Sequence, residues 1–423
     1  MIRKILGKIR KDELIRGSFT LFILINLFNL FGYIQHLIMA RMLGPVDYGI
    51  FAVLMSFVLI YAIPSEAIQT VISRNTSKLN VGKDFGKMKD MMYKSLKNGA
   101  FVSLAVFIVF TILSFTLFSE ILKINALLLT IGNLLIFAMF LVPVTRGIIQ
   151  GRKKFSALGW TMFLEAILKV GLSAIFVYIG WRVYGAIIGV IVAVIAVLAL
   201  SFAFIREIVS ARREKVESGG LYFGNLNIWL AVAAVFIFFS SDIIIAKAVF
   251  EPELAGKYAV LSMIGKMIFY GTSGISKVMF PISSQRFEEK KESSDVFKKS
   301  LIITLMLCIA AVIITGLFPT LVIKILFGTT YTDVYYALLY VIIAFSLLSI
   351  SNLFILYGIS KNRFTKRSSL PFILLFAAEI ILLGFFSENS ITKFAIYFII
   401  INIMILLWSA YIATAKRKAE QQR

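Results

Sequence analysis

Lysine residues stand inside apolar stretches of this chain, where few water molecules would surround them. Lys266 and Lys277 both lie in the apolar stretch 256–280, with Tyr270 and Ser273 between them. This spacing places the four side chains on one face of a helix. A lysine ammonium can hold an anion such as a phosphate group without rigid geometry. Lys277 is close enough to the end of the stretch to extend its amine to the membrane surface, so Lys266 is the first candidate for an anion-binding residue.

Two further cations, Arg146 and Lys169, are candidates for the same anion site. Glu165 precedes Lys169 by four residues, the favourable order for an ion pair on a helix, so this pair is alternatively a structural one. Asp242 and Glu165 are each either a counter-ion, Asp242 for Lys266 and Glu165 for Lys169, or a carboxylate that binds a coupling ion. A charge at the bilayer centre costs about 2.5–3.5 kcal/mol on insertion scales, so each of these residues is expected to face a partner or a watery cavity.

Two more carboxylates lie within apolar stretches. Glu379, in the stretch 369–386, is a second candidate for ion coupling. Glu66 shares a helical face with Gln69, which we expect to be a cavity-facing polar residue. Glu66 is a candidate for ion coupling as well, and alternatively an interfacial partner for Arg74 or Arg146.

The first apolar stretch, 17–40, carries a polar stripe. The stripe follows helical spacing, and the other faces are Leu, Ile and Phe; its members are Asn26, Asn29, Tyr33 and His36. Polar stripes of this kind either form hydrogen-bonded seams between membrane helices or line a cavity.

Several chemistries are excluded by residue counts. Cys308 is the only cysteine and His36 the only histidine, so neither an internal disulfide nor a metal site rich in Cys or His can form. No glycine-rich phosphate loop of the Walker type is present. We therefore expect no cofactor and no enzyme activity. The net charge of +22 does not indicate a nucleic-acid partner, because the basic residues fall between apolar stretches and form no single basic domain.

The composition requires a bilayer as the solvent. Hydrophobic residues make up 60% of the 423 residues, and the mean hydropathy is +0.91. Stretches long enough to cross a membrane recur along the chain and predict about twelve helices. They lie at 17–40, 47–72, 98–119, 125–149, 156–179, 184–205, 222–246, 256–280, 299–319, 332–357, 369–386 and 391–413.

The basic residues also predict the orientation. Every second loop is rich in Lys and Arg, including the N-terminal segment 1–16, the linker 206–221 and the tail 414–423. Positively charged loops stay on the cytoplasmic side, so both termini are expected in the cytoplasm and the protein in the cytoplasmic (inner) membrane. Residues 2–16 are too charged for the apolar region of a cleavable signal, so no cleavage is expected.

The chain contains an internal repeat. Residues 40–54 and 246–261 both carry a basic residue, a proline, a glycine, an aromatic residue and Ala-Val-Leu in the same order. A tight helix hairpin explains the proline and the glycine but not the other matches. The repeat predicts two six-helix bundles, 17–205 and 222–413, joined by the cytoplasmic linker.

These motifs carry a resemblance to a known family. The first hairpin, Ala40-Arg41-Met42-Leu43-Gly44-Pro45, the stretch 146–155 and Tyr184-Gly185-Ala186 resemble the polysaccharide-transporter branch of the multidrug/oligosaccharidyl-lipid/polysaccharide (MOP) exporter superfamily. The resemblance implies a V-shaped, twelve-helix flippase with a central cavity that moves polyprenyl-diphosphate-linked oligosaccharides by alternating access. In such a flippase the four cations Lys266, Lys277, Arg146 and Lys169 would hold the diphosphate. The polar side chains would face the sugars, and one of the carboxylates would couple transport to an ion gradient. Relatives that move murein precursors have an arginine-rich first helix, whereas this chain has Gln35 and His36 there.

The expected partners are the lipid-linked oligosaccharide, membrane lipids and, from the same pathway, a glycan polymerase and glycosyltransferases. The absence of a Walker loop favours an ion gradient as the energy source. One alternative is a cation-coupled multidrug exporter of the same superfamily, which would favour acids over cations in its cavity. Another is a glycosyltransferase or ligase, but the outer loops are too short for an acceptor-binding domain.

Overall fold

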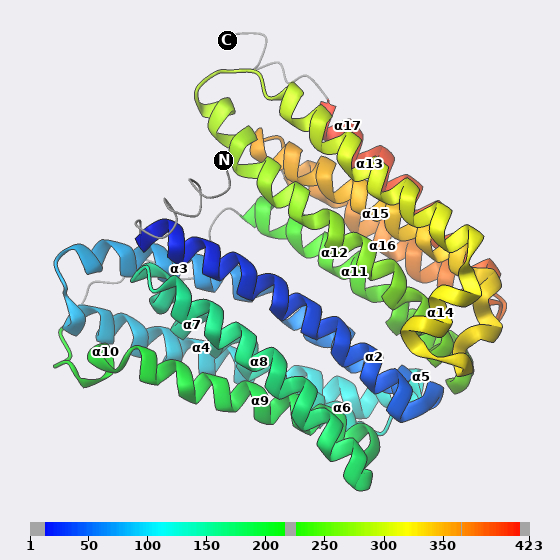
Figure 1. Ribbon diagram of the computed structural model, residues 1–423, viewed down its shortest axis with the longest axis horizontal. Coiled ribbons are helices and arrows are strands. Elements are labelled where there is room, and N and C mark those ends of the chain that lie inside the picture. Colours follow the sequence, from blue (N-terminus) through cyan, green and yellow to red (C-terminus); the bar gives the residue numbers. More distant parts are fainter. Residues whose placement is uncertain (1–12, 216–225, 365, 415–423) are drawn as a thin grey trace. The chain divides into compact units, whose positions relative to one another are not determined.

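A computed structural model describes residues 13–215, 226–364 and 366–414, and these residues are helical apart from short turns. The chain forms two compact units. The first consists of Met1–Leu43 and Phe57–Gly224, and the second of Gly44–Ser56 and Asn225–Arg423. Figure 1 traces the helices along the chain.

The first unit contains the helices from α2 to α10, except for the middle part of α2, Gly44–Ser56, which belongs to the second unit. Their bounds are α2 Glu13–Tyr61, α3 Ile63–Val81, α4 Phe85–Leu113, the π-helical turn η1 Ser114–Phe118, α5 Ser119–Leu122, α6 Ala126–Asn133, α7 Leu135–Gly151, α8 Phe155–Phe176, the π-helical turn η2 Val177–Trp181, α9 Arg182–Phe204 and α10 Arg206–Ser210. α7 packs on α3 and α4, and α8 packs on α9. Because α7 presents Gly147 and Gly151 to α3, the two backbones approach closely over a core that includes Ile72, Met88 and Ile148.

The second unit is built around α15. Its elements are α11 Leu226–Val249, α12 Pro252–Glu288, α13 Ser294–Leu317, α14 Pro319–Phe327, the 3₁₀ turn η3 Thr329–Val334, α15 Tyr335–Ser360, α16 Lys366–Phe385 and α17 Ile391–Thr414. α15 packs against α12, α13 and α17, while α16 packs against α11 and α17. The stacked rings of Phe297 and Tyr357, 4.3 Å apart, tie α13 to α15.

The segment Gly44–Ser56 belongs to the second unit, whereas the sequence places it in the bundle 17–205. The reason is local packing. The fully buried ring of Tyr48 lies 6.4 Å from the rings of both Phe327 and Tyr331. Gly49 packs directly on the backbone of Gly256. The two glycines hold the same place in the predicted repeat, so its two copies meet at their glycines.

Helices that can span a membrane cover most of the described residues. Seven helical stretches there are long and apolar enough, and Leu370–Phe385 is a shorter apolar helix. Each of the twelve predicted ranges falls on helical structure, apart from short turns and the undescribed residues 222–225. Two of the seven stretches, Ile23–Val81 and Phe155–Phe204, each cover two predicted ranges. Gly44 (φ 71°) and Gly180 (φ 102°) turn the chain between those ranges with almost no loop. The prediction of an all-helical, multi-pass membrane protein is confirmed.

Candidate functional site

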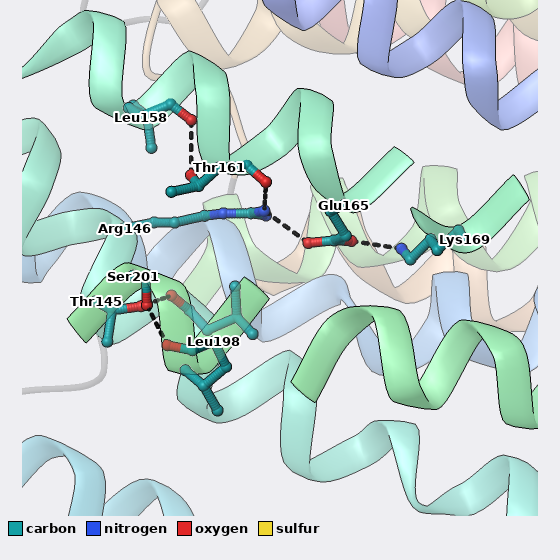
Figure 2. A network of polar contacts seen from close by, with 9 residues as sticks. Thr145, Arg146, Leu158, Thr161, Glu165, Lys169, Leu198 and Ser201 are labelled. Carbon is teal, nitrogen blue, oxygen red and sulfur yellow. Dashed lines mark hydrogen bonds and ion pairs between the residues drawn. The ribbon is translucent and has the colours of Figure 1, made fainter. Parts of the chain in front are cut away.

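Most of the charged residues singled out in the sequence lie in two separate groups, one in each unit, while Glu66 and Lys277 lie exposed outside them. In the first unit, Glu165 on α8 lies between Arg146 at the end of α7 and Lys169 one turn further along α8, as Figure 2 shows. The Arg146 Nη2 lies 2.6 Å from Glu165 Oε2, and the Lys169 Nζ lies 2.5 Å from Glu165 Oε1. The predicted Glu165–Lys169 ion pair is confirmed. We call these three residues the α7–α8 cluster.

The α7–α8 cluster holds more positive than negative charge. Two cations share one buried carboxylate, so the formal charge of the cluster is +1. The side chains of Arg146 and Lys169 remain 12% and 18% exposed. The Arg146 Nε is buried and finds no acceptor among the described residues, and the Lys169 ammonium lies 5.9 Å from the ring centroid of Phe28. The exposed parts of the two cations are the donors that could reach an anion.

The pairing of Arg146 with Glu165 concerns one of the partners that the sequence suggests for Glu66. The sequence offered Arg146 or Arg74 as a partner for Glu66. Arg146 instead bonds Glu165, because one turn of α8 brings that carboxylate beside the end of α7. Glu66 and Arg74 are both exposed on α3, where the neighbouring Gln69 donates a hydrogen bond to Gln150 on α7 at 2.9 Å.

In the second unit, Lys266 on α12 is enclosed. Its side chain is 2% exposed, and its Nζ lies 3.0 Å from Asp242 Oδ1 on α11. The rings of Phe239 and Phe345 flank the ammonium, with centroids 5.2 and 5.8 Å away. The structure thus pairs Asp242 with Lys266, the contact expected of a counter-ion, and encloses the ammonium.

Two hydroxyls complete the coordination of Asp242. Tyr258 and Ser262, both on α12, donate hydrogen bonds to Asp242 Oδ2 at 3.2 and 2.5 Å. Sequence reasoning missed both, although they precede Lys266 by eight and four residues and so share its helical face. We call these four residues the α11–α12 cluster.

The remainder of the stripe on α12 differs from Lys266 in exposure. Tyr270 is half-buried, with its ring centroid 5.1 Å from that of Phe239. The Ser273 hydroxyl donates to the backbone oxygen of Tyr270 at 2.8 Å, and Lys277 is exposed. The stripe therefore does not present Lys266 and Lys277 to one common ligand, because α12 passes from the packed interior to an exposed stretch.

Glu379 on α16 is fully buried near the α11–α12 cluster. Its Oε1 accepts a hydrogen bond from Ser241, the residue before Asp242, at 2.9 Å. Its Oε2 has no donor among the described residues.

The polar stripe on α2 is only partly enclosed. Asn26 and Asn29 are exposed, and Tyr33 and His36 are half-buried. Gln35, which the sequence did not assign to a site, is buried and donates to the Ser173 hydroxyl on α8 at 3.3 Å. Gln35 thus adds an interhelical hydrogen bond between α2 and α8.

Comparison with solved structures establishes the fold. A multidrug resistance transporter of the MATE family and MOP superfamily, in an inward-facing conformation, superposes with a TM-score of 0.68 over 92% of this chain and 94% of that chain at 15% identity. A MATE transporter in complex with MaD5 gives 0.61 over 97% and 96% at 14% identity. A MOP-superfamily transporter from Pyrococcus furiosus, described as having a binding pocket of reverse polarity, gives 0.59 over 95% of both chains at 15% identity.

Comparison at the level of sequence establishes the family. Among curated protein sequences, none matches the chain significantly. The family described as "Polysaccharide biosynthesis protein" matches residues 38–336, which is more than half of the chain. This protein therefore belongs to the polysaccharide biosynthesis protein family and has the fold of the MOP-superfamily transporters.

Proposed function

We propose that this transporter moves a polyprenyl-diphosphate-linked oligosaccharide across the cytoplasmic membrane by alternating access, driven by an ion gradient. The observation that carries the proposal is the α7–α8 cluster, a partly exposed group with formal charge +1 among helices that span the membrane. The family match to polysaccharide biosynthesis supports a glycan as the cargo.

The α7–α8 cluster suits a diphosphate better than the α11–α12 cluster does. An uncompensated cation among membrane helices is costly, so its retention favours a role in holding an anion. Arginine binds phosphate with several donors, and the side chain of Arg146 retains 12% of its surface exposed. Lys266, by contrast, is neutralised by Asp242 and is 2% exposed. We therefore place the diphosphate at Arg146 and Lys169, and Lys277 remains a further candidate because it is exposed.

The sugars would contact polar side chains of the first unit that retain exposed surface. These are Asn26, Asn29, Tyr33, His36 and Gln69. The glycan polymerase and glycosyltransferases that make and use such a cargo are the proposed pathway partners.

A cation-coupled multidrug exporter is the second candidate, because the solved structures with this fold include multidrug transporters. Such an exporter would bind cationic compounds through carboxylates. Glu165 is occupied by two cations, and Asp242 is bonded to Lys266, so neither carboxylate is positioned to attract a cationic drug.

The test compares charge variants of the α7–α8 cluster for binding of a polyprenyl-diphosphate oligosaccharide to the full-length protein in lipid nanodiscs. Lys169→Gln and Arg146→Gln are each expected to weaken binding by about 10- to 100-fold, since a hydrogen bond to a charged group contributes roughly 1.5–3 kcal/mol. Glu165→Gln removes the competing carboxylate and is expected to strengthen binding. The matched control is Lys257→Gln, which removes a lysine that is salt-bridged to Glu253 and Asp333 at the other end of α12 from Lys277.

Two results would contradict the proposal. If Glu165→Gln weakens diphosphate binding as strongly as Lys169→Gln does, the cluster is a structural ion pair. If the wild-type protein binds a cationic dye and a diphosphate lipid does not displace it, the protein is better described as a drug exporter. Transfer of a labelled lipid-linked oligosaccharide between the leaflets of proteoliposomes then measures transport itself.

A further inference from the structure

A buried carboxylate near the start of α4 holds two cations at the surface of the first unit. Asp90 is fully buried, and its two oxygens lie 2.8 Å from the Nζ of Lys94 and 2.6 Å from the Nε of Arg213. Lys94 is one turn further along α4, whereas Arg213 comes from the segment that follows α10. The side chains of Lys94 and Arg213 remain 33% and 42% exposed. Asp90 thus fixes the position of both cations and neutralises the charge of one.

The segment that carries Arg213 is attached to α4 by its backbone. The Lys89 Nζ donates hydrogen bonds to two backbone oxygens of this segment at 2.6 and 3.0 Å, and the Glu214 N–H donates to the backbone oxygen of Gly86 at 3.2 Å. The approach is so close that a Cβ atom at Gly86 would lie 2.5 Å from the backbone oxygen of Arg212. Figure 1 shows α10 beside the start of α4. The fold therefore places Arg213 on this helix.

The same face of α4 continues into the bilayer as an apolar surface. Tyr93, whose ring centroid lies 4.2 Å from the guanidinium carbon of Arg213, is exposed on this face, and so is Lys97 one turn further on. Beyond Lys97 the exposed residues are apolar, and they begin with Phe101 (75% exposed) and Leu104. Of the spanning stretches among the described residues, the one that contains α4 has the smallest buried share, 11%. Lipid chains cover such a face.

We propose that this face of α4 binds an anionic phospholipid of the adjoining leaflet, which the loop charges predict to be the cytoplasmic one. The phosphate lies against Lys94, Lys97 and Arg213, which together with Asp90 carry a formal charge of +2, and an acyl chain follows the apolar face beyond Lys97. An arginine binds phosphate through several donors, and this one is already oriented by a carboxylate and an aromatic ring. The lipid bridges α4 and the segment after α10, and so strengthens their attachment.

The predicted repeat supplies a comparison for this face. α13 begins the third predicted span of the second bundle, as α4 does in the first, and Lys298 directly precedes that span just as Lys97 precedes its own. The position that matches Asp90 is occupied by Lys291, which pairs with Glu289 on the surface. Both halves thus have an exposed lysine where the span begins, whereas the buried carboxylate with its two cations lies at α4.

The first experiment measures binding of phosphatidylglycerol and phosphatidylcholine to the purified full-length protein by native mass spectrometry. We expect the wild type to bind phosphatidylglycerol more tightly. Arg213→Gln and Lys97→Gln are each expected to weaken phosphatidylglycerol binding about fivefold, the effect of one basic residue near an anionic lipid, and to leave phosphatidylcholine binding unchanged. Lys298→Gln is the matched control, because it removes an equal charge at the start of the matching span. Unfolding temperatures in phosphatidylcholine check that each variant is folded.

Two results of this experiment would overturn the proposal. If Lys298→Gln weakens phosphatidylglycerol binding as much as Lys97→Gln does, the attraction is a general property of basic helix ends. If Arg213→Gln and Lys97→Gln weaken binding of a polyprenyl diphosphate but not of phosphatidylglycerol, the face belongs to the path of the cargo.

The second experiment tests the bridge between α4 and the segment after α10. Hydrogen exchange of residues 206–214 is compared in nanodiscs of phosphatidylcholine alone and in nanodiscs that also contain phosphatidylglycerol. In the wild type, phosphatidylglycerol is expected to slow the exchange. Lys97 lies one turn beyond Tyr93, the ring that contacts Arg213, so Lys97→Gln is expected to lose this slowing while its exchange in phosphatidylcholine stays as in the wild type. Equal exchange of the wild type in both lipids would show that no anionic lipid joins the segment to α4.

Discussion

Lys266 and Asp242 show how burial changes the meaning of a charged residue. In the sequence, Lys266 is a cation in the middle of an apolar stretch and the first candidate for a diphosphate ligand. In the fold its ammonium is bonded to Asp242 at 3.0 Å and lies between two aromatic rings. Removing one member of a buried ion pair leaves the other charge uncompensated, which is costlier than losing the pair as a whole.

We therefore expect Lys266→Met to destabilise the second unit by about 3–5 kcal/mol, with Asp242→Asn costing less because Tyr258 and Ser262 can still bond the amide oxygen. Thermal unfolding in detergent and abundance in the membrane measure this effect. The double variant is expected to be more stable than Lys266→Met alone. Lys277→Met, which removes an exposed lysine from the same helix, serves as the control.

A different outcome would restore the diphosphate role that the sequence predicts for Lys266. In that case Lys266→Met would remain abundant and stable while it lost binding of the diphosphate lipid.

The candidate site was predictable as far as it depends on one helix. The Glu165–Lys169 pair follows from spacing alone, and the Tyr258–Ser262–Lys266 face could have been found in the same way. Contacts between helices could not be predicted from the sequence, because they depend on the rotation of each helix about its axis. That Arg146 would bond Glu165 and not Glu66 is such a contact.

At the scale of elements, the helices were predictable because apolar length alone indicates a membrane span. The division of the helices between the two units could not be predicted in this way. Gly44–Ser56 packs with the second unit through the contacts of Tyr48 and Gly49, which lie far apart in the sequence from Phe327, Tyr331 and Gly256. Hydropathy carries no information about such long-range contacts.

The contact at Gly256 leads to a prediction for α12. A Cβ atom at this position would lie 1.7 Å from the backbone oxygen of Pro45, so Gly256→Ala must force the two backbones apart. We expect a loss of roughly 1–3 kcal/mol from overpacking, measured as a lower unfolding temperature. Gly274→Ala on the same helix meets no atom within 4 Å and is expected to leave the unfolding temperature unchanged or slightly higher. Equal effects of the two variants would show that the close approach contributes nothing.

The short helix α10 is held by an ion pair that makes its attachment depend on pH. Glu207 accepts hydrogen bonds from Arg152 at 2.6 Å and Lys154 at 3.3 Å. The hydrogen bond from Arg152, followed by that from Lys154, holds the pKa of Glu207 below its ordinary value. A carboxyl with a lowered pKa stabilises the fold above its unfolded-state pKa, and this contribution is lost as the pH falls through the lowered value.

We therefore expect the end of α9 and α10 to become less protected from hydrogen exchange as the pH is lowered from neutral through the pKa of Glu207. In Glu207→Gln the protection should be lower at neutral pH and should vary less with pH. A wild-type profile that matches the variant at every pH would mean that the ion pair does not hold α10.

At the scale of the whole molecule, the remaining prediction concerns the two faces of the membrane. Lys and Arg are concentrated in every second loop, which predicts that the loop with Lys83 and the loop with Asn362 are cytoplasmic. The loops with Lys123 and Asn389 should then lie on the other side. Because the chain has one buried cysteine, Cys308, a Cys308→Ser background allows a single cysteine to be placed at each of these positions.

A membrane-impermeant thiol reagent applied to intact cells is expected to label cysteines at 123 and 389 and to spare those at 83 and 362 until the membrane is opened. The four positions test the number of spans as well as the orientation, because one missed crossing between two of them would reverse all later loops. If 83 and 123 were labelled from the same side, α4 with its extension to Leu122 would not cross the membrane. If 123 and 389 were labelled from opposite sides, the number of crossings between them would be odd. The predicted repeat of two six-helix bundles with one common orientation would then be wrong, since it requires an even number.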